Sequence, residues 1–407
     1  MSGIAGRHVV LGVSGGIASY KACILARRLT EDGAHVDVVL TAGAAEFIRP
    51  LTFEALTGRT VVTSLWEPGR ALDHVRLGRE PELIIVAPAT AQLIARMAQG
   101  MADDFLTALL LARKAPVLLC PAMNDQMFSH PATQANLERL GPGVGGQGSS
   151  ITILGPVAGP LAHGEGQGPG RMVEPEEIRD WAHRMLCRAR PFTGRHVVVT
   201  AGPTREPLDP VRVLTNRSSG RMGYALARAA WLRGADVTLI TGPSALTPPT
   251  GVKVVRIETT DELQLAVKQS LPIADVLLMA AAPADYKSAT VSGHKVKRDA
   301  GPVSLTLEPT ADVLASTANA RRSSAVVVGF ALETEDMVAT AREKLSRKQL
   351  DLIVANSATE PGSGPESLTN RVTLVSAKTV EPLPLLPKEE VAEAILDRVG
   401  AVLAERE

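Results

Sequence analysis

The sequence has 407 residues, basic and acidic side chains in equal numbers at 43 each, and 3% aromatic residues. This length predicts two domains, and the balanced charge with so few aromatic rings argues against a nucleic-acid partner, because phosphate backbones require a basic surface. The three cysteines match no zinc or disulfide spacing, and no apolar run reaches the roughly 18 to 20 residues that span a membrane, so we expect a cytoplasmic protein without a membrane partner.

The first elements in chain order form a βαβ pattern. We expect a strand at 9–11, a glycine turn at 12–16, a helix through residue 28 and a second strand at 33–41. A continuous apolar run at 83–86 indicates a strand that is buried on both faces. The first half therefore predicts a doubly wound α/β domain with three layers.

The glycine turn favours a mononucleotide phosphate. Its glycines do not follow GxGxxG, and the second strand ends in Thr41, where a dinucleotide would need an acidic residue for its ribose. An NAD-dependent oxidoreductase is therefore disfavoured. Ser14, Gly15 and Gly16 supply a hydroxyl and backbone N–H groups ahead of a helix, which suits a phosphate. A tight turn without a ligand is the alternative.

Two further polar residues have the chemistry of an active site. His74 has the titration range of a general base, although a lone histidine is more often a surface or core residue. Asn124 follows an apolar strand at 117–120, at the sheet edge where α/β proteins bind ligands. An asparagine at such a position forms a turn about as often as it contacts a ligand.

The segment 141–170 has an unusual composition, with 11 glycines and 4 prolines. This composition predicts a long loop. Loops of this length in compact domains are usually functional or disordered. We favour a functional loop, because it ends in the ordered pattern Gly170-Arg171-Met172.

A short internal repeat marks the start of the second half: the sequence Gly6-Arg7-His8-Val9-Val10 occurs again as Gly194-Arg195-His196-Val197-Val198. We predict a first domain at 1–188, a linker at 189–194 and a second domain at 195–407. In the second domain, we expect a strand at 197–199, a helix at 223–233, a strand at 234–241 and a buried strand at 276–279. This order predicts another doubly wound α/β domain.

Polar motifs of the second half suit phosphates or a carboxylate. Hydroxyls, an amide and a cation precede a helix in Asn216–Gly223, although a capped helix start is the alternative. Lys295 and Lys297 are close in sequence, and Lys344 and Lys348 lie one helical turn apart. Such lysines usually form a solvated face, but a triphosphate also requires them. GxxxxGK[ST] does not occur in the sequence, so a P-loop is excluded.

In this order, the motifs closely resemble the bacterial bifunctional phosphopantothenoylcysteine decarboxylase and phosphopantothenate-cysteine ligase. The resemblance spans nearly the whole chain. The matching stretches of the first half are Gly12–Ala18, Thr41 with Phe47, Ala87–Ala91, Gly100–Asp104, Pro121–Asn124, Met127 and His130–Thr133. Those of the second half are Thr200–Gly202, Thr204–Pro207, Asp209–Arg212, Asn216, Ser218–Gly220, Ala280–Tyr286, Lys295–Lys297, Gly329–Ala331 and Asp351–Asn356.

For the first domain, the resemblance implies a flavodoxin-like or Rossmann-like fold that binds FMN. His74 would be the base, Asn124 would hold the substrate carboxylate, and the loop ending at Arg171 would be a clamp. FMN would oxidise the cysteinyl thiol of the substrate to a thiocarbonyl, which eases loss of the neighbouring carboxylate, and the hydride would then return to the product. The implied FMN contacts are Ser14, Gly15, Gly16, Thr41, Pro88, Ala89, Thr90 and Met101, and the implied clamp residues are Met127, Gly164 and Arg171.

For the second, Rossmann-like domain, the resemblance implies activation of 4'-phosphopantothenate by CTP and Mg²⁺ as an acyl-cytidylate, which cysteine then attacks. Asn216 matches the residue needed for the acyl intermediate, and Lys295 matches the one needed for activation. The metal ligands are left open. The implied CTP contacts are Gly202, Ser218, Ser219, Met279, Ala280, Ala281, Asp285, Lys295, Ala311, Asp312, Val313, Leu314, Phe330, Lys344 and Lys348.

The resemblance also implies a homo-oligomer. Trimers of the first domain, with active sites between subunits, and dimers of the second would together give a dodecamer.

The departures from the family pattern at Gln92, Pro203, Arg221 and Pro283 keep size or charge roughly intact, and the serious departure is in the first domain. His163 stands where the family has the cysteine that protonates the enethiol intermediate. We hypothesise that His163 is the proton donor, with water or another side chain as the alternative. A rival interpretation is a working ligase fused to a flavin-binding regulatory or scaffolding module that has lost turnover. The missing cysteine favours this rival, whereas retention of His74, Asn124 and Arg171 opposes it.

Overall fold

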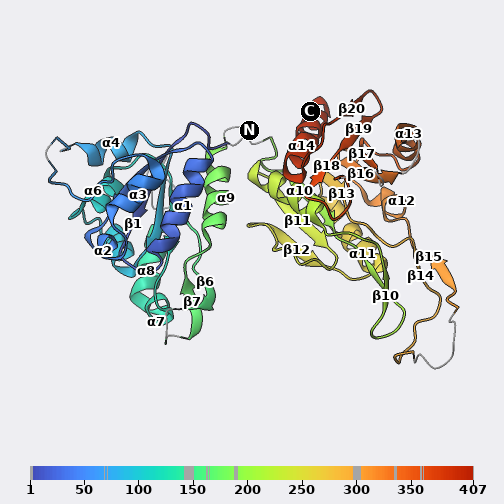
Figure 1. The fold of residues 1–407 in the computed structure, drawn as a ribbon, viewed down its shortest axis with the longest axis horizontal. Coiled ribbons are helices and arrows are strands. Elements are labelled where there is room, and N and C mark those ends of the chain that lie inside the picture. Colours follow the sequence, from blue (N-terminus) through green and yellow to red (C-terminus); the bar gives the residue numbers. More distant parts are fainter. Residues whose placement is uncertain are drawn as a thin grey trace. The chain divides into compact units, whose positions relative to one another are not determined.

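Figure 1 shows the fold of the computed structural model, in which the chain divides into two compact units, Met1–Arg188 and Ala189–Glu407. The structure describes residues 3–67, 69–70, 72–141, 151–161, 164, 166–187, 191–296, 304–333, 337–357, 360 and 362–406. Each unit is a mixed α/β structure built on a largely parallel sheet, which confirms the predicted fold class.

The sheet of the first unit is parallel and has five strands in the order β2-β1-β3-β4-β5. Its strands are β1 (His8–Val13), β2 (His35–Leu40), β3 (Leu83–Ala89), β4 (Val117–Pro121) and β5 (Ile151–Ile153), and a separate pair is formed by β6 (Val157–Pro160) and β7 (Gln167–Arg171). Its helices are α1 (Ser19–Glu31), α2 (Ala42–Phe47), α3 (Pro50–Thr57), α4 (Asp73–Arg79), α5 (Ala91–Gln99), α6 (Phe105–Ala112), α7 (Asp125–Ser129), α8 (Pro131–Leu140) and α9 (Pro175–Leu186).

Two apolar clusters cover the two faces of this sheet and give the unit three layers. Alternate strand residues such as Val9 and Ile85 pack with α1, α3 and α9, while Val10 and Ile84 pack with α5, α6 and α8 on the other face. Figure 1 shows α1 and α9 side by side on one face. The continuous apolar strands predicted from the sequence follow from this burial on both faces.

The expectation of irregular structure throughout 141–170 is wrong for part of that segment. β5 extends the main sheet, and β6 pairs with β7 as an antiparallel ribbon. Glycine and proline are tolerated because this ribbon has no central strand whose ladder they would weaken. Residues 142–150, 162–163 and 165 lie outside the described part of the chain.

The second unit has an eight-stranded sheet in the order β12-β11-β8-β13-β16-β17-β19-β20, parallel from β12 to β17 and antiparallel at β19 and β20. These strands are β8 (His196–Ala201), β11 (Asp236–Thr241), β12 (Lys253–Arg256), β13 (Val276–Met279), β16 (Val326–Glu333), β17 (Leu352–Ser357), β19 (Val372–Ser376) and β20 (Val380–Pro382). Three small antiparallel pairs join β9 (Arg205–Pro207) with β10 (Val213–Thr215), β14 (Tyr286–Ser288) with β15 (Leu307–Pro309), and β18 (Thr369–Asn370) with β21 (Leu386–Pro387).

Helices cover both faces of this second sheet. They are α10 (Arg221–Leu232), α11 (Thr260–Ser270), α12 (Val313–Ser316), α13 (Met337–Arg347), α14 (Lys388–Arg406) and the short 3₁₀ turns Leu271–Ile273 and Ala318–Ala320. On one face, α11, α12 and α13 pack on strand residues such as Val198 and Leu277. On the other face, α10 packs against α14 and β8. Within the described residues, every helix is too short or too polar to cross a membrane.

Candidate functional sites

The first unit has its candidate site at the point where the strand order reverses. In the order β2-β1-β3-β4-β5, the chain leaves β1 toward one side and β3 toward the other, so the loops after these two strands diverge. This arrangement opens a crevice at the carboxyl ends of the strands, and flavodoxin-like sheets bind ligands there.

Ser14 links the two loops at this crevice. Its hydroxyl donates to the carbonyl oxygen of Pro88 at 2.8 Å and accepts from the backbone N–H of Thr90 at 3.0 Å. The hydroxyl of Thr90 in turn accepts from the N–H of Leu93 at 3.4 Å and caps α5. The Ser14 hydroxyl therefore already forms hydrogen bonds within the protein, while Thr90 lines the open space.

Gly15 sits where no side chain fits. A Cβ atom at this position would lie 2.6 Å from the carbonyl carbon of Gly43, in the first turn of α2. This close approach brings Thr41, which caps α2 through the N–H of Ala44, to the same opening. A cavity of about 360 Å³ results, lined by Ser14, Gly15, Thr41 and Thr90 among others.

A second cavity of about 570 Å³ adjoins the first, because Gly15 and Thr90 line both. Three residues predicted for substrate binding, Asn124, Met127 and Arg171, line it. The β6–β7 ribbon closes one side, because Met123 N–H donates to the carbonyl oxygen of Gly170 at 3.0 Å. A Cβ atom on Gly170 would lie 2.2 Å from the carbonyl oxygen of Met123, so only glycine permits this contact.

Lys21 of this cavity was not predicted from the sequence. It is 4% exposed, and its ammonium group donates to Met172 O at 2.9 Å and to the Glu174 carboxylate at 3.0 Å. The same carboxylate forms an ion pair with Arg171, so Lys21 supports the end of β7. A lysine inside an amphipathic helix is normally solvated, and the sequence carries no signal of its burial.

Other predicted residues of the first unit do not themselves line these two cavities. Pro88 and Ala89 are within β3, and Met101 is about half exposed. His74, on α4, packs edge-on against Phe105 with ring centroids 6.4 Å apart, and its buried Nδ1 has no hydrogen-bond partner in the described structure. Gly164 has open space around it, and His163 lies outside the described residues.

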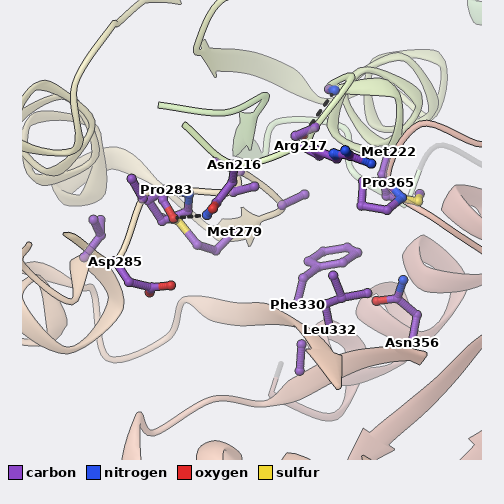
Figure 2. Close-up of a pocket in the computed structure, with 18 of the residues that line it drawn as sticks. Asn216, Arg217, Met222, Met279, Pro283, Asp285, Phe330, Leu332, Asn356 and Pro365 are labelled. Atoms are coloured by element: carbon purple, nitrogen blue, oxygen red, sulfur yellow. Dashed lines mark hydrogen bonds between the residues drawn. The ribbon is translucent and has the colours of Figure 1, made fainter. Parts of the chain in front are cut away.

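The second unit also has a cavity at a reversal of strand order, between β8 and β13 (Figure 2). Its volume is about 820 Å³. The loop after β13 runs alongside the loop after β8, since Ala282 N–H donates to Gly202 O at 2.9 Å. The order of the six parallel strands and this position match the site of nucleotide-binding Rossmann sheets.

Asn216 lies at the rim of this cavity. Its side-chain amide donates to Pro283 O at 2.8 Å, the contact drawn in Figure 2. The preceding Thr215 anchors β10, because its hydroxyl donates to Thr204 O at 2.6 Å. The amide oxygen of Asn216 stays available to a ligand.

Most of the residues predicted to contact CTP line the same cavity. They are Ser218, Met279, Ala280, Ala281, Asp285, Ala311, Asp312, Val313, Leu314, Phe330 and Lys348. Lys348 forms an ion pair with Asp312 at 2.9 Å. Burial by itself would raise the pKa of Asp312, but the hydrogen bond and charge of Lys348 hold that pKa below its usual range.

Four predicted residues are placed elsewhere. Gly202 and Ser219 do not line this cavity: Ser219 lines a second cavity of the unit and donates to Pro365 O at 2.8 Å. Lys344 lies in the last turns of α13, four residues before Lys348. Lys295 is exposed on the long segment between β14 and β15, which projects from the body of the unit in Figure 1.

Hydrogen bonds to the neighbouring Val296 hold the backbone next to Lys295 in place. The buried Asp209 carboxylate accepts from Val296 N–H at 3.2 Å, and Arg212 donates to Val296 O at 2.7 Å. Arg212 also pairs with Asp209 at 2.6 Å and holds the pKa of that carboxyl well below its usual range. Lys297 lies outside the described residues.

Sequence reasoning included Arg221 only within the polar stretch 216–223 that suits a phosphate, assigned no role to Lys388, and quoted Asn356 only as part of a matching stretch. All three line the cavity. Asn356 comes at the carboxyl end of the buried strand β17, a position that sequence could have flagged. Lys388 begins α14 far along the chain, and nothing in the local sequence distinguishes it from a solvated lysine.

Comparisons with known proteins give the family. A family described as "Flavoprotein" matches residues 2–186, and "DNA/pantothenate metabolism flavoprotein C-terminal domain" matches residues 192–403. The chain is 42% identical over 407 residues to the coenzyme A biosynthesis bifunctional protein CoaBC of Vibrio vulnificus strain CMCP6, covering 99% of this chain and 100% of that protein. It is 43% identical over 401 residues to the protein of the same name from Escherichia coli strain K12, covering 97% of each.

A solved structure of the C-terminal domain of coenzyme A biosynthesis bifunctional protein CoaBC is 37% identical, with a TM-score of 0.46, and covers 53% of this chain and 99% of that chain. The identities over nearly the full length of both relatives exceed what a shared fold alone would produce. The chain belongs to the family of bifunctional coenzyme A biosynthesis proteins.

Proposed function

We propose that this chain catalyses two consecutive reactions of coenzyme A biosynthesis, as a phosphopantothenate-cysteine ligase and a phosphopantothenoylcysteine decarboxylase. The ligase joins 4'-phosphopantothenate to cysteine in domain 195–407, and the decarboxylase converts the product to 4'-phosphopantetheine in domain 1–188, with 189–194 as the linker. The observation that carries this function is that each family match coincides with one unit, and each unit has a cavity at its own strand reversal.

The opening at Gly15 fits the phosphate end of FMN. A small turn beside Thr41 and Thr90 leaves hydroxyls and backbone groups for a phosphate, and the adjoining cavity is large enough for a flat ring. FMN, when bound, supplies the two-electron oxidation of the substrate thiol and the later return of the hydride. Pro88, Ala89 and Met101 remain proposed contacts on the family resemblance alone.

We assign the substrate-binding roles of the decarboxylase to residues at the larger cavity. Asn124 would donate to the substrate carboxylate, and Arg171, supported by Glu174 and Lys21, would hold the ribbon over it. Met127 would pack against the substrate. His74 does not itself line either cavity of its unit, although it packs on Phe105 at the smaller one, and a second copy of the unit in the proposed trimer would let it act as a base.

In the ligase, the carboxylate of 4'-phosphopantothenate would attack the α-phosphorus of CTP and release pyrophosphate, and the cysteine amine would then displace CMP from the acyl-cytidylate. Asn216 would orient the acyl group from the cavity rim, and Lys295 would stabilise the charge on the transferring phosphoryl group. Because Lys295 lies outside the cavity, its role requires its segment to move or a second copy to supply it, as in the proposed dimer. Mg²⁺ would accompany CTP.

A product assay on the purified chain tests both halves. With CTP, Mg²⁺, cysteine and 4'-phosphopantothenate, we expect CMP and pyrophosphate to form, followed by carbon dioxide and 4'-phosphopantetheine, and a flavin absorbance in the protein itself. Lys295→Gln should abolish pyrophosphate release, whereas Asn216→Asp should still release pyrophosphate but stall before transfer to cysteine. Equal turnover with ATP and CTP would refute the cytidylate, and a colourless protein would refute the flavin site.

A second candidate function rests on one observation, the histidine at position 163 in place of a cysteine. In this alternative, the ligase works and the first domain binds flavin as a scaffold without turnover. The same assay separates the two, because the scaffold would form phosphopantothenoylcysteine and release no carbon dioxide from it. A cytoplasmic location stays a prediction of the sequence.

A further inference from the structure

Two cationic side chains of the second unit's cavity have no carboxylate partner among the described residues. Lys388 is 3% exposed, and its ammonium group donates only to the carbonyl oxygens of Gly364 at 3.3 Å and Pro365 at 3.0 Å. Arg221 has a buried Nε without any hydrogen-bond partner. Lys348 differs from both, because it is neutralised by Asp312 at the same cavity.

The two cations are near enough to repel each other. Burial, and to a lesser extent the positive charge of Arg221, together lower the pKa of Lys388 to about 8, against a weaker opposing effect of Glu389. Burying like charges together is unfavourable unless an anion compensates them. The arrangement is therefore unfavourable without a ligand and becomes favourable when an anion binds.

A helix terminus adds to this positive potential. Arg221 is the first residue of the 12-residue helix α10, whose N-cap Gly220 has φ 79° and whose first turn contains no acidic residue. Gly220 and Arg221 both line the cavity, so the positive end of the helix dipole lies beside it, although Arg221 N–H itself donates to Ser219 Oγ at 3.5 Å. The helix can start this close to β8 because Gly223 has no side chain, and a Cβ there would lie 2.5 Å from Ala201 Cβ.

The acidic Asp285 and the cationic pair lie on opposite sides of the cavity. In Figure 2, Asp285 and the Asn216–Pro283 contact lie on one side, Pro365 and Asn356 lie on the other, and Phe330 lies between them. Because Lys388 donates to Pro365 O, the cationic pair belongs to the side away from Asp285. An anionic group would therefore occupy the Pro365 side.

We propose that Arg221 and Lys388 form a subsite for the pyrophosphoryl end of a nucleoside triphosphate. This proposal rests on the proposed ligase function. The pyrophosphoryl group is the most highly charged part of the reactants, and two cations with a helix N-terminus match it better than they match a lone monoester. When the substrate carboxylate oxygen bonds to the α-phosphorus, the bond from that phosphorus to the bridging oxygen breaks. The subsite then holds the pyrophosphate that leaves with the electron pair.

The other phosphate among the reactants is the 4'-phosphate of phosphopantothenate, and titration calorimetry separates the two sources. Pyrophosphate, CTP, CMP and 4'-phosphopantothenate are each titrated, with Mg²⁺ present, into the full-length chain and into Arg221→Gln and Lys388→Gln. Lys378→Gln is the matched control, since Lys378 is exposed and pairs with Glu405 at the surface. Arg221→Lys tests whether a cation suffices.

We expect each Gln variant to weaken pyrophosphate and CTP by about tenfold or more, while CMP and 4'-phosphopantothenate change by less than about threefold. The control and Arg221→Lys should bind pyrophosphate within about threefold of the unaltered chain. If Lys388→Gln does not fold, Arg221→Gln alone decides the result.

Unchanged pyrophosphate binding in Arg221→Gln would overturn the subsite, as would a loss confined to 4'-phosphopantothenate or an equal loss for CMP. Ligation by the unaltered chain is measured separately. A chain that binds pyrophosphate through these residues and yet fails to ligate would refute the proposed function and not the subsite.

Discussion

At the scale of single residues, the residues that line the cavities were largely those that belong to short sequence motifs. Asn216, Asp285 and Phe330 line one cavity although they are distant in sequence: Asn216 follows β10, Asp285 lies in the loop after β13, and Phe330 lies in the carboxyl-terminal half of β16. Lys21 and Lys388 escaped notice because burial of a lysine depends on what packs around it and not on its neighbours in sequence.

At this scale, we predict that His163 is the proton donor of the decarboxylase. An imidazolium with an ordinary pKa near 6.5 is a stronger acid than a thiol near 8.5, so His163 has the chemistry to replace cysteine. We expect His163→Ala to accumulate the enethiol and His163→Cys to turn over fully, as measured by mass spectrometry of the products. Normal turnover of His163→Ala would show that the proton comes from elsewhere. An unaltered protein that stops at the enethiol would show that the first domain is catalytically incomplete.

Lys388 predicts a specific dependence of stability on pH. Its pKa is about 8 when folded, because of burial and then the charge of Arg221, and it lies below the value near 10.4 of an unfolded lysine. Between these two values, the unfolded chain holds a proton that the folded chain has lost. The free energy of unfolding therefore rises with pH across that window, by an amount on the order of 1 to 3 kcal/mol, and is unaffected by this group below it.

Urea denaturation of the unaltered chain and of Lys388→Met, at about pH 7.5 and pH 10, measures this effect. Trp231 reports on the second unit once Trp66 and Trp181 are replaced by Phe. We expect the unaltered chain to gain stability relative to Lys388→Met between the two pH values. A difference that stays constant with pH would mean that Lys388 titrates normally.

At the scale of elements, the glycines of the segment 151–171 have a structural role that the composition alone did not reveal. Gly168 and Gly170 allow β7 to lie against the loop before α7 and the first residue of that helix. A Cβ on Gly168 would lie 2.8 Å from Asp125 Cβ, and a Cβ on Gly170 would lie 2.2 Å from Met123 O. Composition predicted a loop because glycine and proline disfavour sheets. The ribbon forms nonetheless, since its partner strand and the loop after β4 supply contacts that no local pattern encodes.

Gly170→Ala tests whether this ribbon positions the substrate-binding residues. The added methyl group must push β7 away from Met123 O, at a cost of about 1 to 3 kcal/mol in the stability of the first unit. We expect decarboxylation to fall by about tenfold or more, with flavin absorbance retained and ligation unchanged. Gly3→Ala is the matched control, because its nearest atom would be 3.7 Å away. Full decarboxylation by Gly170→Ala would contradict a positioning role for the ribbon.

At the scale of the whole molecule, the two units each carry a self-contained sheet and their own cavity, yet both lack one predicted residue. His74 does not itself line either cavity described in the first unit, and Lys295 does not line the cavity in the second. Homo-oligomers commonly complete their active sites at subunit interfaces, and the predicted trimers and dimers would do so here.

Mixed oligomers test this arrangement in the first unit. His74→Gln and Asn124→Ala are each expected to abolish decarboxylation alone. If the two side chains of one site come from different subunits, co-expression of both variants should restore roughly a quarter of the activity, because about that share of interfaces combines two intact residues. Carbon dioxide release by the co-purified mixture gives the measurement. Complete inactivity of the mixed oligomers, with each variant folded and flavin-bound, would place both side chains in one subunit.

The sequence by itself determined the two α/β units and the central strands β1 to β4, β8, β11 and β13, because apolar runs and glycine turns report on burial and backbone geometry that are local in the chain. The family followed from the resemblance of short motifs in their order along the chain. The sequence also identified the loop after β1 as a phosphate site from its glycines and hydroxyl, and the loop after β4 from its place at a strand end. The loop after β13 was indicated by the family resemblance.

Only the tertiary structure decided which of those loops meet. Three features depend on contacts between segments that are remote in sequence. They are the strand orders, the close approach of Gly15 to Gly43, and the proximity of Arg221 to Lys388, which lie more than 160 residues apart in the chain. Local propensities carry no information about such contacts, and the burial of charge that marks the proposed anion subsite exists only once the helices have packed.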